Sequence, residues 1–352
     1  MAQCMTFPRL PNNRAAAAPR KCAKIPAMNA VISLEQLYTP INDALGQVRT
    51  SVEQLWIDAL QLVGIDIGAV PKAGGKMLRP ALCLMSAGAI GAKDLSSYVQ
   101  LATAFEALHI ASLAHDDVID RALLRRGKPS LSGMWDNHAA VLGGDYLVAR
   151  AVEILATYNS CPVISNAISS VRRMAEGELY FFNRRDEPYR QEDCIMLARQ
   201  KTASLFAEAV SAPAYILNAA YKDALHGFGI ALGIAFQIVD DLLDVTQPSS
   251  QMGKPACGDI VEGKKTIPIM HLREGLDAAG LARIDALRDG TLSDDDQAWV
   301  AEMAERTGAR ERTEALAREY TSEAVRLLGQ LPPSEYRDAM ENLTEFVLVR
   351  AL

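Results

Sequence analysis

The sequence has 352 residues and a formal net charge of −7, with 49% hydrophobic but only 6% aromatic residues. This length suits one large helical domain or two ordinary ones, and the acidic balance argues against nucleic acid as a general partner. Its six cysteines are scattered without a Cys-x-x-Cys pair, which argues against a zinc site or a disulfide framework and favours the cytoplasm.

The chain begins with a basic segment. Residues 1–34 contain five basic residues and no acidic one, with neither helical periodicity nor the apolar core of a secretory signal. We interpret residues 1–32 as a disordered tail, or as an over-long start if Met28 is the true initiator; a transit-like segment is the alternative. Residues 33–352 then form one folded domain. No run reaches the roughly 18 uninterrupted apolar residues of a membrane span.

Helical periodicity dominates from residue 33 onward. Ser33 with Gln36 is typical of a capping box and opens the first helix. A loop is expected over 64–75, and the next helix is expected to begin just after Pro80. No alternating strand pattern of useful length occurs, so the sequence predicts an all-α, single-domain bundle. Further helices are expected over 94–120, 139–158, 162–182, 190–210, 223–245, 294–306 (capped by Ser293 with Asp296), 309–329 and 334–350.

Two aspartate triplets with the same spacing lie in apolar helical segments. Carboxylates at i and i+4 are neighbours on a helix and destabilise it by roughly 0.2–0.5 kcal/mol per pair. One such cluster would be a solvated acidic patch, but Asp is rarely buried unpaired, and two copies favour a bound cation. Magnesium binds through one or two carboxylates plus substrate phosphates, so the triplets predict a magnesium–diphosphate site. The triplets are Asp116, Asp117 and Asp120, and Asp240, Asp241 and Asp244.

Basic residues follow or precede these triplets in a fixed order. Each alone is more often a surface charge, and a lone His on an amphipathic helix is usually structural. Glycines at 74 and 75 allow the backbone to approach an anion at a helix entrance, and His109 lies on roughly the same helix face as the first triplet. We therefore interpret the set as counter-ligands for phosphate groups. Its members are Lys76, Arg79, His109, Arg125, Arg126, Lys201, Lys254 and Lys264.

From about residue 34 to 350 the chain resembles the trans-isoprenyl diphosphate synthase (polyprenyl synthetase) family, whose octaprenyl-type and other medium- to long-chain members are the nearest in kind. The resemblance rests on GGKMLRP at 74–80, FEALHIASLAHDDVIDRALLRRGKPS at 105–130, GGDYLVARA at 143–151, KTASLF at 201–206, FQIVDDLLD at 236–244 and GKPACGDIVEGKKTIP at 253–268. It implies the isoprenoid synthase fold, a helical bundle around a deep central cavity, in a homodimer. It also implies a catalytic domain over 33–352 that condenses isopentenyl diphosphate head-to-tail onto an allylic diphosphate, with Mg²⁺, three ions per active site, as cofactor.

The resemblance also implies roles for single residues. The metal ligands are Asp116, Asp117, Asp120 and Asp240, with Asp241 and Asp244 in support. The allylic diphosphate is contacted by Arg125, Lys201, Lys254 and Lys264, and isopentenyl diphosphate by Lys76, Arg79, His109 and Arg126. Thr202 and Gln237 are similar to the polar groups that the family places near the developing cation. Met77 stands where relatives often carry a basic residue, which affects no ligand position.

Three alternatives share parts of this pattern. A class I terpene cyclase would normally replace the second triplet and lack the site at Lys76 and Arg79. A non-catalytic partner subunit would be expected to have lost aspartates, and all six are present. A head-to-head synthase is disfavoured by GGKMLRP and KTASLF. The allylic starter and the pathway served stay open, and a long product could bring the protein to membrane surfaces.

Product length depends on the helix before the first triplet. In the family the growing chain runs along this helix, and bulky aromatic residues there limit its length. The plainer interpretation of Ala111 and Ser112 is that they are small core residues. Phe105 lies eleven residues before Asp116, about 16 Å at 1.5 Å per residue. We expect a product longer than fifteen carbons, preferably twenty-five to forty, with a twenty-carbon or farnesyl product as the alternative. The wall positions are Ala111, Ser112, Leu108 and Phe105.

Overall fold

The computed structural model describes residues 33–62, 75–120, 124–125, 128–129, 133, 136–184, 187–248, 256–288, 290 and 292–349, with only the backbone for 124–125 and 128–129. The predictions for residues 1–32 and for most of the loop over 64–75 lie outside them. Residues from Ser33 onward belong to one compact unit. Its first half contains α1 (Leu34–Leu37), η1 (Thr39–Ile41), α2 (Asn42–Leu62), α3 (Leu78–Ala89), η3 (Leu95–Tyr98), α4 (Val99–Ile119), the antiparallel pair β1 (Leu124–Arg125) and β2 (Lys128–Pro129), α6 (Asn137–Ala156) and α7 (Cys161–Phe182). Its second half contains α8 (Gln191–Ala198), η4 (Arg199–Ala203), α9 (Ser204–Ile216), α10 (Lys222–Thr246), α12 (Gly258–Val261), α13 (Ile267–Gly275), α14 (Ala278–Ala286), α15 (Asp294–Arg306), α16 (Ala309–Leu328) and α17 (Glu335–Val349).

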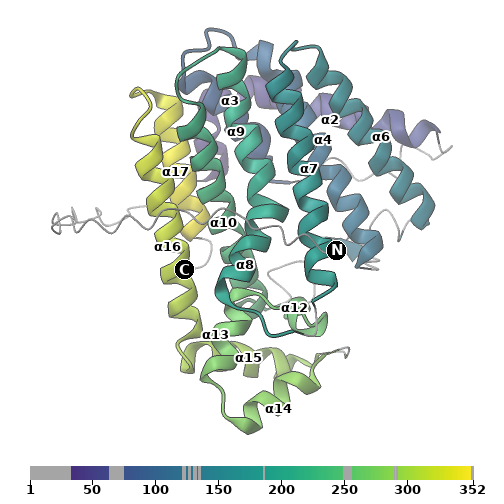
Figure 1. Ribbon diagram of the computed structural model, residues 1–352, viewed down its shortest axis with the longest axis vertical. Coiled ribbons are helices and arrows are strands. Elements are labelled where there is room, and N and C mark those ends of the chain that lie inside the picture. The colour runs from purple at the N-terminus through teal and green to yellow at the C-terminus, as the bar shows by residue number, and fades with distance from the viewer. Residues whose placement is uncertain are drawn as a thin grey trace, which may run out of the picture. The chain divides into compact units, whose positions relative to one another are not determined.

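Helix α9 is the centre of the bundle. Nearly every residue of this helix is buried, and α3, α7 and α10 pack around it (Figure 1). Glycines on α10 allow a very close approach: a Cβ on Gly229 would lie 2.4 Å from the Cα of Ala207, and one on Gly233 would lie 2.4 Å from the Cα of Ala203. Only glycine permits such contact between two helix backbones. The crossing brings the start of α9 against the middle of α10.

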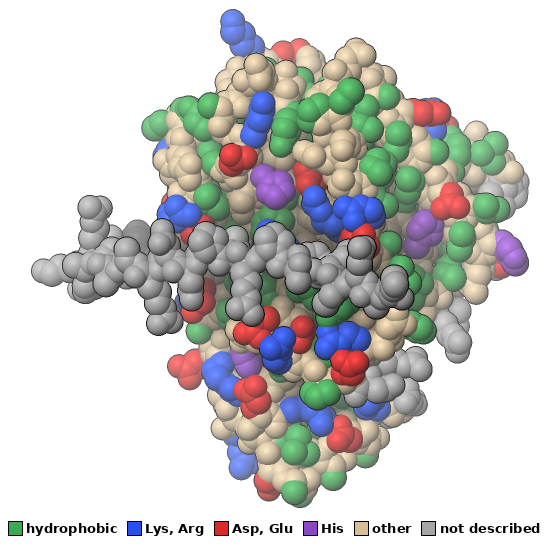
Figure 2. Space-filling model, viewed as in Figure 1, with side chains coloured by type: hydrophobic (Ala, Val, Ile, Leu, Met, Phe, Trp, Pro, Cys, Tyr) green, Lys and Arg blue, Asp and Glu red, His purple; other side chains and the backbone are tan. Residues whose placement is uncertain are grey.

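The short helices α13, α14 and α15 lie at the lower end of the view in Figure 1 and have a core cluster of their own. Figure 2 shows Lys, Arg, Asp and Glu side chains interspersed over this lower part of the visible face. Ion pairs such as Arg273–Asp285 and Arg283–Asp296 account for part of this pattern. Exposed pairs of this kind contribute only about 0–1 kcal/mol each. This region therefore depends on a smaller core than the long-helix bundle does.

The all-α prediction is confirmed, and so are both capping boxes, at Ser33 and Ser293. The predicted start after Pro80 is wrong, because α3 begins at Leu78; a proline is tolerated in the first helical turn, where the backbone N–H has no intrahelical partner. The predicted helix over 94–120 begins with the short 3₁₀ helix η3 before α4.

The predicted helix over 190–210 is wrong as a single element, because it consists of α8, the π-helical turn η4 and α9. Helices α12, α13 and α14, and the two-residue strands β1 and β2, were not predicted. Among the described residues no helix is long and apolar enough to cross a membrane.

Candidate functional site

The first aspartate triplet lies at the C-terminal end of α4. Asp116 is partly exposed, Asp117 is buried, and Asp120 closes the helix by donating its backbone N–H to the Asp116 carbonyl at 2.8 Å. The Nζ atom of Lys201 lies 3.6 Å from Oδ2 of Asp116. A lysine from another element therefore lies directly beside the first triplet.

Lys201 lies in the π-helical turn η4, where the Ser204 N–H donates to the Arg199 carbonyl five residues earlier. Such turns are rare and frequently mark functional sites. The Nζ atom of Lys201 also lies 2.6 Å from Oε1 of Glu178 on α7. Burial lowers the pKa of Lys201, but Asp116 and Glu178 outweigh it, so the net pKa lies above the usual lysine value. Lys201 is therefore a cation at neutral pH, held between two carboxylates.

The second triplet lies near the C-terminal end of α10 and is connected to η4 by side-chain hydrogen bonds. Thr202 donates its hydroxyl proton to Oε1 of Gln237 at 2.6 Å, and Nε2 of Gln237 donates to Oδ1 of Asp241 at 2.7 Å. Burial raises the pKa of Asp241 well above its usual range, and the charge of Asp259 adds to this shift, while the bond from Gln237 opposes it. Asp240 and Asp244 raise it further.

Asp244 has a second kind of contact. Its side chain is buried, and its Oδ2 accepts a hydrogen bond from the backbone N–H of Asp259 at 3.0 Å, at the start of α12. The Asp244 carbonyl also accepts from the Cys257 N–H at 2.8 Å. The third aspartate of this triplet thus fixes the segment that follows α10.

That segment carries Lys264. Its Nζ lies 3.7 Å from Oδ1 of Asp259 and forms an ion pair with Glu262. Burial lowers the pKa of Lys264, but Asp259, Glu262 and Asp120 outweigh it and raise the net pKa above the usual lysine value. The contribution of Asp120 shows that this turn lies near the end of the first triplet. Lys264 also lowers the pKa of Lys201, so the two lysines lie within electrostatic reach of each other.

The structure places Lys76 and Arg79 at the entrance of α3. Met77 between them has a left-handed backbone, φ 51°, and the Lys76 carbonyl accepts a hydrogen bond from the Tyr38 hydroxyl at 2.5 Å. Arg79 stacks its guanidinium on the Phe206 ring, with Cζ 4.3 Å from the centroid. Burial lowers the pKa of Arg79 to about 10, against the opposing effect of Glu106. Among the described residues its Nε has no hydrogen-bond partner.

Other predicted residues are placed less fully. The side chain of Arg125 and all of Arg126 and Lys254 lie outside the described residues. His109 is partly buried on α4, and its carbonyl accepts a hydrogen bond from the Ser112 hydroxyl at 2.8 Å. The other wall residues Ala111, Leu108 and Phe105 are buried in the main core.

Among the described residues, no group of three His, Cys, Asp or Glu side chains is already arranged to hold a metal ion. Magnesium usually binds through one or two carboxylates together with substrate phosphates, so a complete protein cage is not required. The donor set itself fits a hard cation, because, in addition to burial, the charges of Asp240 and Asp244 help to raise the pKa of Asp241. A divalent ion lowers the free energy of such a cluster.

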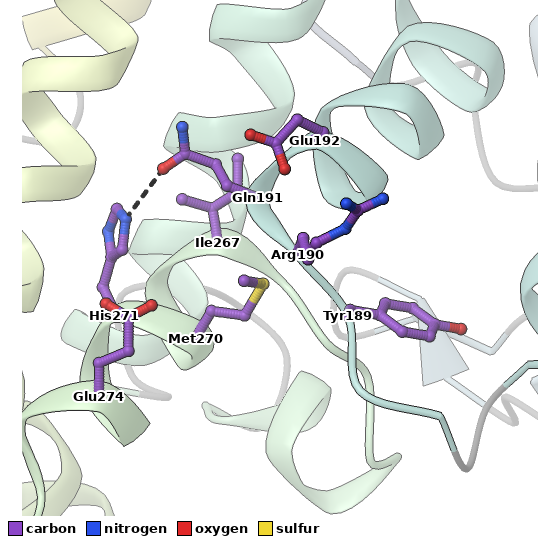
Figure 3. A pocket seen from close by; sticks show the side chains of 8 residues that line it. All are labelled: Tyr189, Arg190, Gln191, Glu192, Ile267, Met270, His271 and Glu274. Atoms are coloured by element: carbon purple, nitrogen blue, oxygen red, sulfur yellow. Dashed lines mark hydrogen bonds between the residues drawn. The ribbon is translucent and has the colours of Figure 1, made fainter.

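A pocket of about 300 Å³ lies between the start of α8 and α13 (Figure 3). His271 is hydrogen bonded there to Gln191 at 3.3 Å, and its Nδ1 lies 2.9 Å from the Thr313 hydroxyl. That hydroxyl donates its proton to the Ala309 carbonyl at 2.7 Å. None of the predicted ligands lines this pocket, and none lines a larger groove of about 870 Å³ along η1 and the start of α2.

Three carboxylates of this site were missed by sequence reasoning: Glu178, Asp259 and Glu262. Asp259 and Glu262 lie inside the quoted segment GKPACGDIVEGKK, where their closeness to Lys264 was a usable signal. Glu178 offered none, because its contact with Lys201 spans two helices. Together, the two carboxylate triplets with Lys201 and Lys264 form a site suited to a metal-bound diphosphate, as a transferase of diphosphate esters would need.

The comparisons with known proteins agree with this class. The family model for polyprenyl synthetase matches residues 67–302. The all-trans-nonaprenyl-diphosphate synthase (geranyl-diphosphate specific) of Rhodobacter capsulatus is 35% identical over 285 residues, 80% of this chain and 87% of that protein. The chain belongs to the polyprenyl synthetase family and is a prenyltransferase.

Solved structures show the same fold. A decaprenyl diphosphate synthase from Rhodobacter capsulatus superimposes with a TM-score of 0.79 at 30% identity, covering 91% of this chain and all of the other. A polyprenyl synthase from Caulobacter crescentus, solved with calcium and isoprenyl diphosphate, gives 0.79 at 31% identity, covering 90% of this chain and 97% of the other. Members of the family use a divalent metal and join isopentenyl diphosphate to allylic diphosphates.

Proposed function

We propose that this chain condenses isopentenyl diphosphate onto an allylic diphosphate with Mg²⁺ and releases an all-trans polyprenyl diphosphate longer than fifteen carbons. One observation carries the proposal. Lys201 and Thr202 are adjacent in η4, yet Lys201 contacts Asp116 of the first triplet while Thr202 leads through Gln237 to Asp241 of the second. A single turn therefore faces both carboxylate groups.

The reaction needs the allylic carbon–oxygen bond to break, with its electron pair leaving on the diphosphate. The aspartates would hold Mg²⁺, three ions by family resemblance, and the metal would neutralise charge on the departing oxygens. Lys201 and Lys264 add fixed positive charge beside them, which is usually a large catalytic contribution because it needs no reorganisation. The double bond of isopentenyl diphosphate then attacks the allylic cation, and the proton lost from the new chain passes to the released diphosphate.

Thr202 and Gln237 suit the electron-poor carbon. The Thr202 hydroxyl donates its only proton to Gln237, so its oxygen lone pairs remain free to face a developing positive charge. Thr202 is also almost fully buried, which keeps water from the cation. We assign both residues to stabilisation of the cation rather than to acid–base chemistry.

Arg79, with Lys76 and His109, is proposed to bind the diphosphate of isopentenyl diphosphate. The guanidinium of Arg79 is held flat on Phe206, leaving its planar edge for a bidentate contact with phosphate oxygens. Its Nε has no hydrogen-bond partner within the described part of the chain, which supports this assignment. Arg126 is proposed for the same subsite, and Arg125 and Lys254 for the allylic diphosphate, by family resemblance alone.

The product length and the oligomer are proposed on separate grounds. Small buried Ala111 leaves the wall below the first triplet without an aromatic ring until Phe105, which supports a long chain. A homodimer, which the family resemblance implies, agrees with the exposed apolar side chains on α6 and α7. They are Val141, Leu142, Ile168, Leu179 and Phe182. Free cysteines among the described residues support a reducing, cytoplasmic location.

The test is incorporation of labelled isopentenyl diphosphate with farnesyl diphosphate as the starter, followed by chromatography of the dephosphorylated products. We expect products beyond fifteen carbons that require Mg²⁺ and disappear with a chelator. Cyclised hydrocarbons without incorporation of isopentenyl diphosphate would indicate a terpene cyclase instead. Light scattering of the same sample should give twice the mass of one chain.

A further inference from the structure

Two consecutive lysines lie in the turn between α12 and α13 and make different contacts. Lys264 pairs with Asp259 and Glu262, whereas Lys265 contacts residues that precede α8. We propose that Lys265 is a positioning residue: its contact with the Tyr189 ring fixes the turn that places Lys264 beside the substrate diphosphate. This inference rests on the proposed role of Lys264 and adds to it the residues that hold that lysine in place.

Lys265 makes three contacts with α8 and the residues just before it. The Nζ atom of Lys265 lies 4.3 Å from the centroid of the Tyr189 ring and donates a hydrogen bond to the Glu187 carbonyl. The Lys265 carbonyl accepts a hydrogen bond from the Cys194 thiol at 2.9 Å, so both the side chain and the backbone of Lys265 are attached to the α8 side. A cation over an aromatic face is worth more when it is partly shielded from water, as both partners are here.

Tyr189 is itself anchored to the end of α7. Its hydroxyl donates to the Phe181 carbonyl at 3.1 Å, and the two rings pack with centroids 4.9 Å apart. The same last turn of α7 carries Glu178, which pairs with Lys201. One helix end therefore supports both lysines: Lys201 directly through Glu178, and the Lys264 turn through Phe181, Tyr189 and Lys265.

Asp244 of α10 holds the backbone of Cys257 and Asp259 at the start of the Lys264 segment, and the turn that carries Lys264 follows these contacts. Its preceding helix, α12, has only four residues, and Gly263 adopts a left-handed φ of 67°. Of the two ion-pair partners of Lys264, Asp259 is fixed to α10 through its backbone N–H, whereas Glu262 lies at the end of α12, next to the turn itself. Lys264 is also about two-fifths exposed. A shift of roughly 1 Å at a group that acts on a transition state can cost up to about 100-fold in rate, so an external anchor has a measurable function.

The test compares Lys265→Met and Tyr189→Leu with the conservative variants Lys265→Arg and Tyr189→Phe, using farnesyl diphosphate and labelled isopentenyl diphosphate. Lys265→Met should lower kcat about tenfold, leave KM for isopentenyl diphosphate within about twofold, and weaken inhibition by inorganic diphosphate to a similar degree. Tyr189→Leu should do the same, and the double variant should be no worse than either single one, because both remove one contact. Lys265→Arg and Tyr189→Phe keep a cation and a ring and should lose less.

The chain supplies a matched control. Lys222 lies over the Tyr215 ring at 5.2 Å and donates to Asn218 at 3.3 Å, at the α9–α10 connection. Lys222→Met and Tyr215→Leu should keep wild-type kcat and diphosphate inhibition. Thermal unfolding of every variant separates loss of stability from loss of catalysis in folded protein, and Tyr189→Leu decides the question if Lys265→Met is not recovered folded.

The outcomes separate two kinds of failure. If Lys264→Met is impaired but Lys265→Met and Tyr189→Leu keep normal kcat, the positioning role is overturned and the proposed function stands. Additive losses in the double variant would also overturn it. If Lys264→Met itself is harmless, the assignment of Lys264 is wrong, and the role of Lys265 falls with it.

Discussion

Lys201 and Lys264 each place a positive charge between two carboxylates, but different parts of the molecule hold them. Lys201 lies inside the bundle, between Asp116 of α4 and Glu178 of α7, two helices of more than twenty residues each. Lys264 lies in a turn after the four-residue α12, and its ion-pair partners come from α12 and the end of that helix. The first lysine is positioned by the packing of long helices, and the second by local contacts and an anchor.

Electrostatics alone does not distinguish the two lysines. In both cases burial lowers the pKa, neighbouring carboxylates outweigh it, and the net pKa is raised. A raised lysine pKa contributes stability that is fully present below the unfolded value of about 10.4 and is lost only as pH rises through the folded value. Both lysines are therefore charged throughout the physiological range, and they should differ in how strictly their positions are maintained.

The largest effect should come from removing one ligand on each side of the site. Asp116→Ala and Asp240→Ala should each lower kcat by at least about 1000-fold, because a lost ligand leaves the departing diphosphate under-neutralised by several kcal/mol. Steady-state assays in saturating Mg²⁺ measure this, with exposed Asp223→Ala on α10 as the control. Near-wild-type turnover of either variant would contradict a shared metal–diphosphate site.

The two lysines should respond unequally to the same substitution. Lys201→Met should lower kcat about 100-fold, since it removes a charge and also leaves Glu178 and Asp116 facing each other. Lys264→Met should lower kcat about tenfold, because that turn is more exposed and water can replace part of the charge. Steady-state kinetics on both variants measure this difference. Equal losses of kcat would contradict the distinction between the two regions.

Arg79, like Lys201, is held by the long-helix bundle, but it should act on isopentenyl diphosphate. Arg79→Met should raise KM for isopentenyl diphosphate about 10- to 100-fold, the value of one or two charge-assisted hydrogen bonds, and change KM for the allylic substrate far less. Lys76→Ala should likewise raise KM for isopentenyl diphosphate more than KM for the allylic substrate. If the allylic substrate shows the larger defect, the two subsites are exchanged.

A change deep in the long-helix region should alter the product more than the rate. Ala111→Phe places a ring in the buried wall of α4, so chain growth should stop earlier while the first condensation changes only a few-fold. Chromatography of dephosphorylated products from both proteins measures the shift. An unchanged product from an active variant would mean that another wall sets the length.

The smallest effect should appear in the short-helix region, at His271. Burial lowers the pKa of His271, and the charge of Arg312 adds to this, whereas Glu274 opposes it. Because the unfolded chain binds this proton at higher pH, stability is full above about pH 6.5 and declines as pH falls toward the folded pKa. Urea midpoints at pH 7.5 and 5.5 should therefore differ less in His271→Gln than in the wild type. Equal pH dependence in both would show that His271 does not titrate with folding.

Sequence reasoning was most successful where periodicity runs long. The repeated aspartate spacing placed the triplets on the helices that are α4 and α10, and Ser33 and Ser293 marked helix starts by their side-chain chemistry. It failed where tertiary contacts decide. The π-turn at 199–203 has no sequence period of its own, and α13 is too short to show one.

The candidate site followed the same rule. Lys201 was expected beside a triplet because of its motif, but its partner Glu178 lies on a different helix and could be found only once both were folded. Asp244 was expected to support a metal, and its backbone contact with Asp259 could not be read from spacing. Residues that bind through a neighbour in space leave no pattern along the chain.

The π-turn η4 contains one residue more than an α-helix would use to cover the same height, and this has a consequence for the history of the chain. Deleting Thr202 or Ala203, which lie between Lys201 and α9, would restore a regular helix without moving the buried face of α9, but it would rotate Lys201 by about 100° relative to that helix. Insertion of a single codon is therefore enough to convert a plain packing helix into one that turns a lysine toward Glu178. The lysine proposed for the active site can therefore be reoriented without repacking the core helix that follows it.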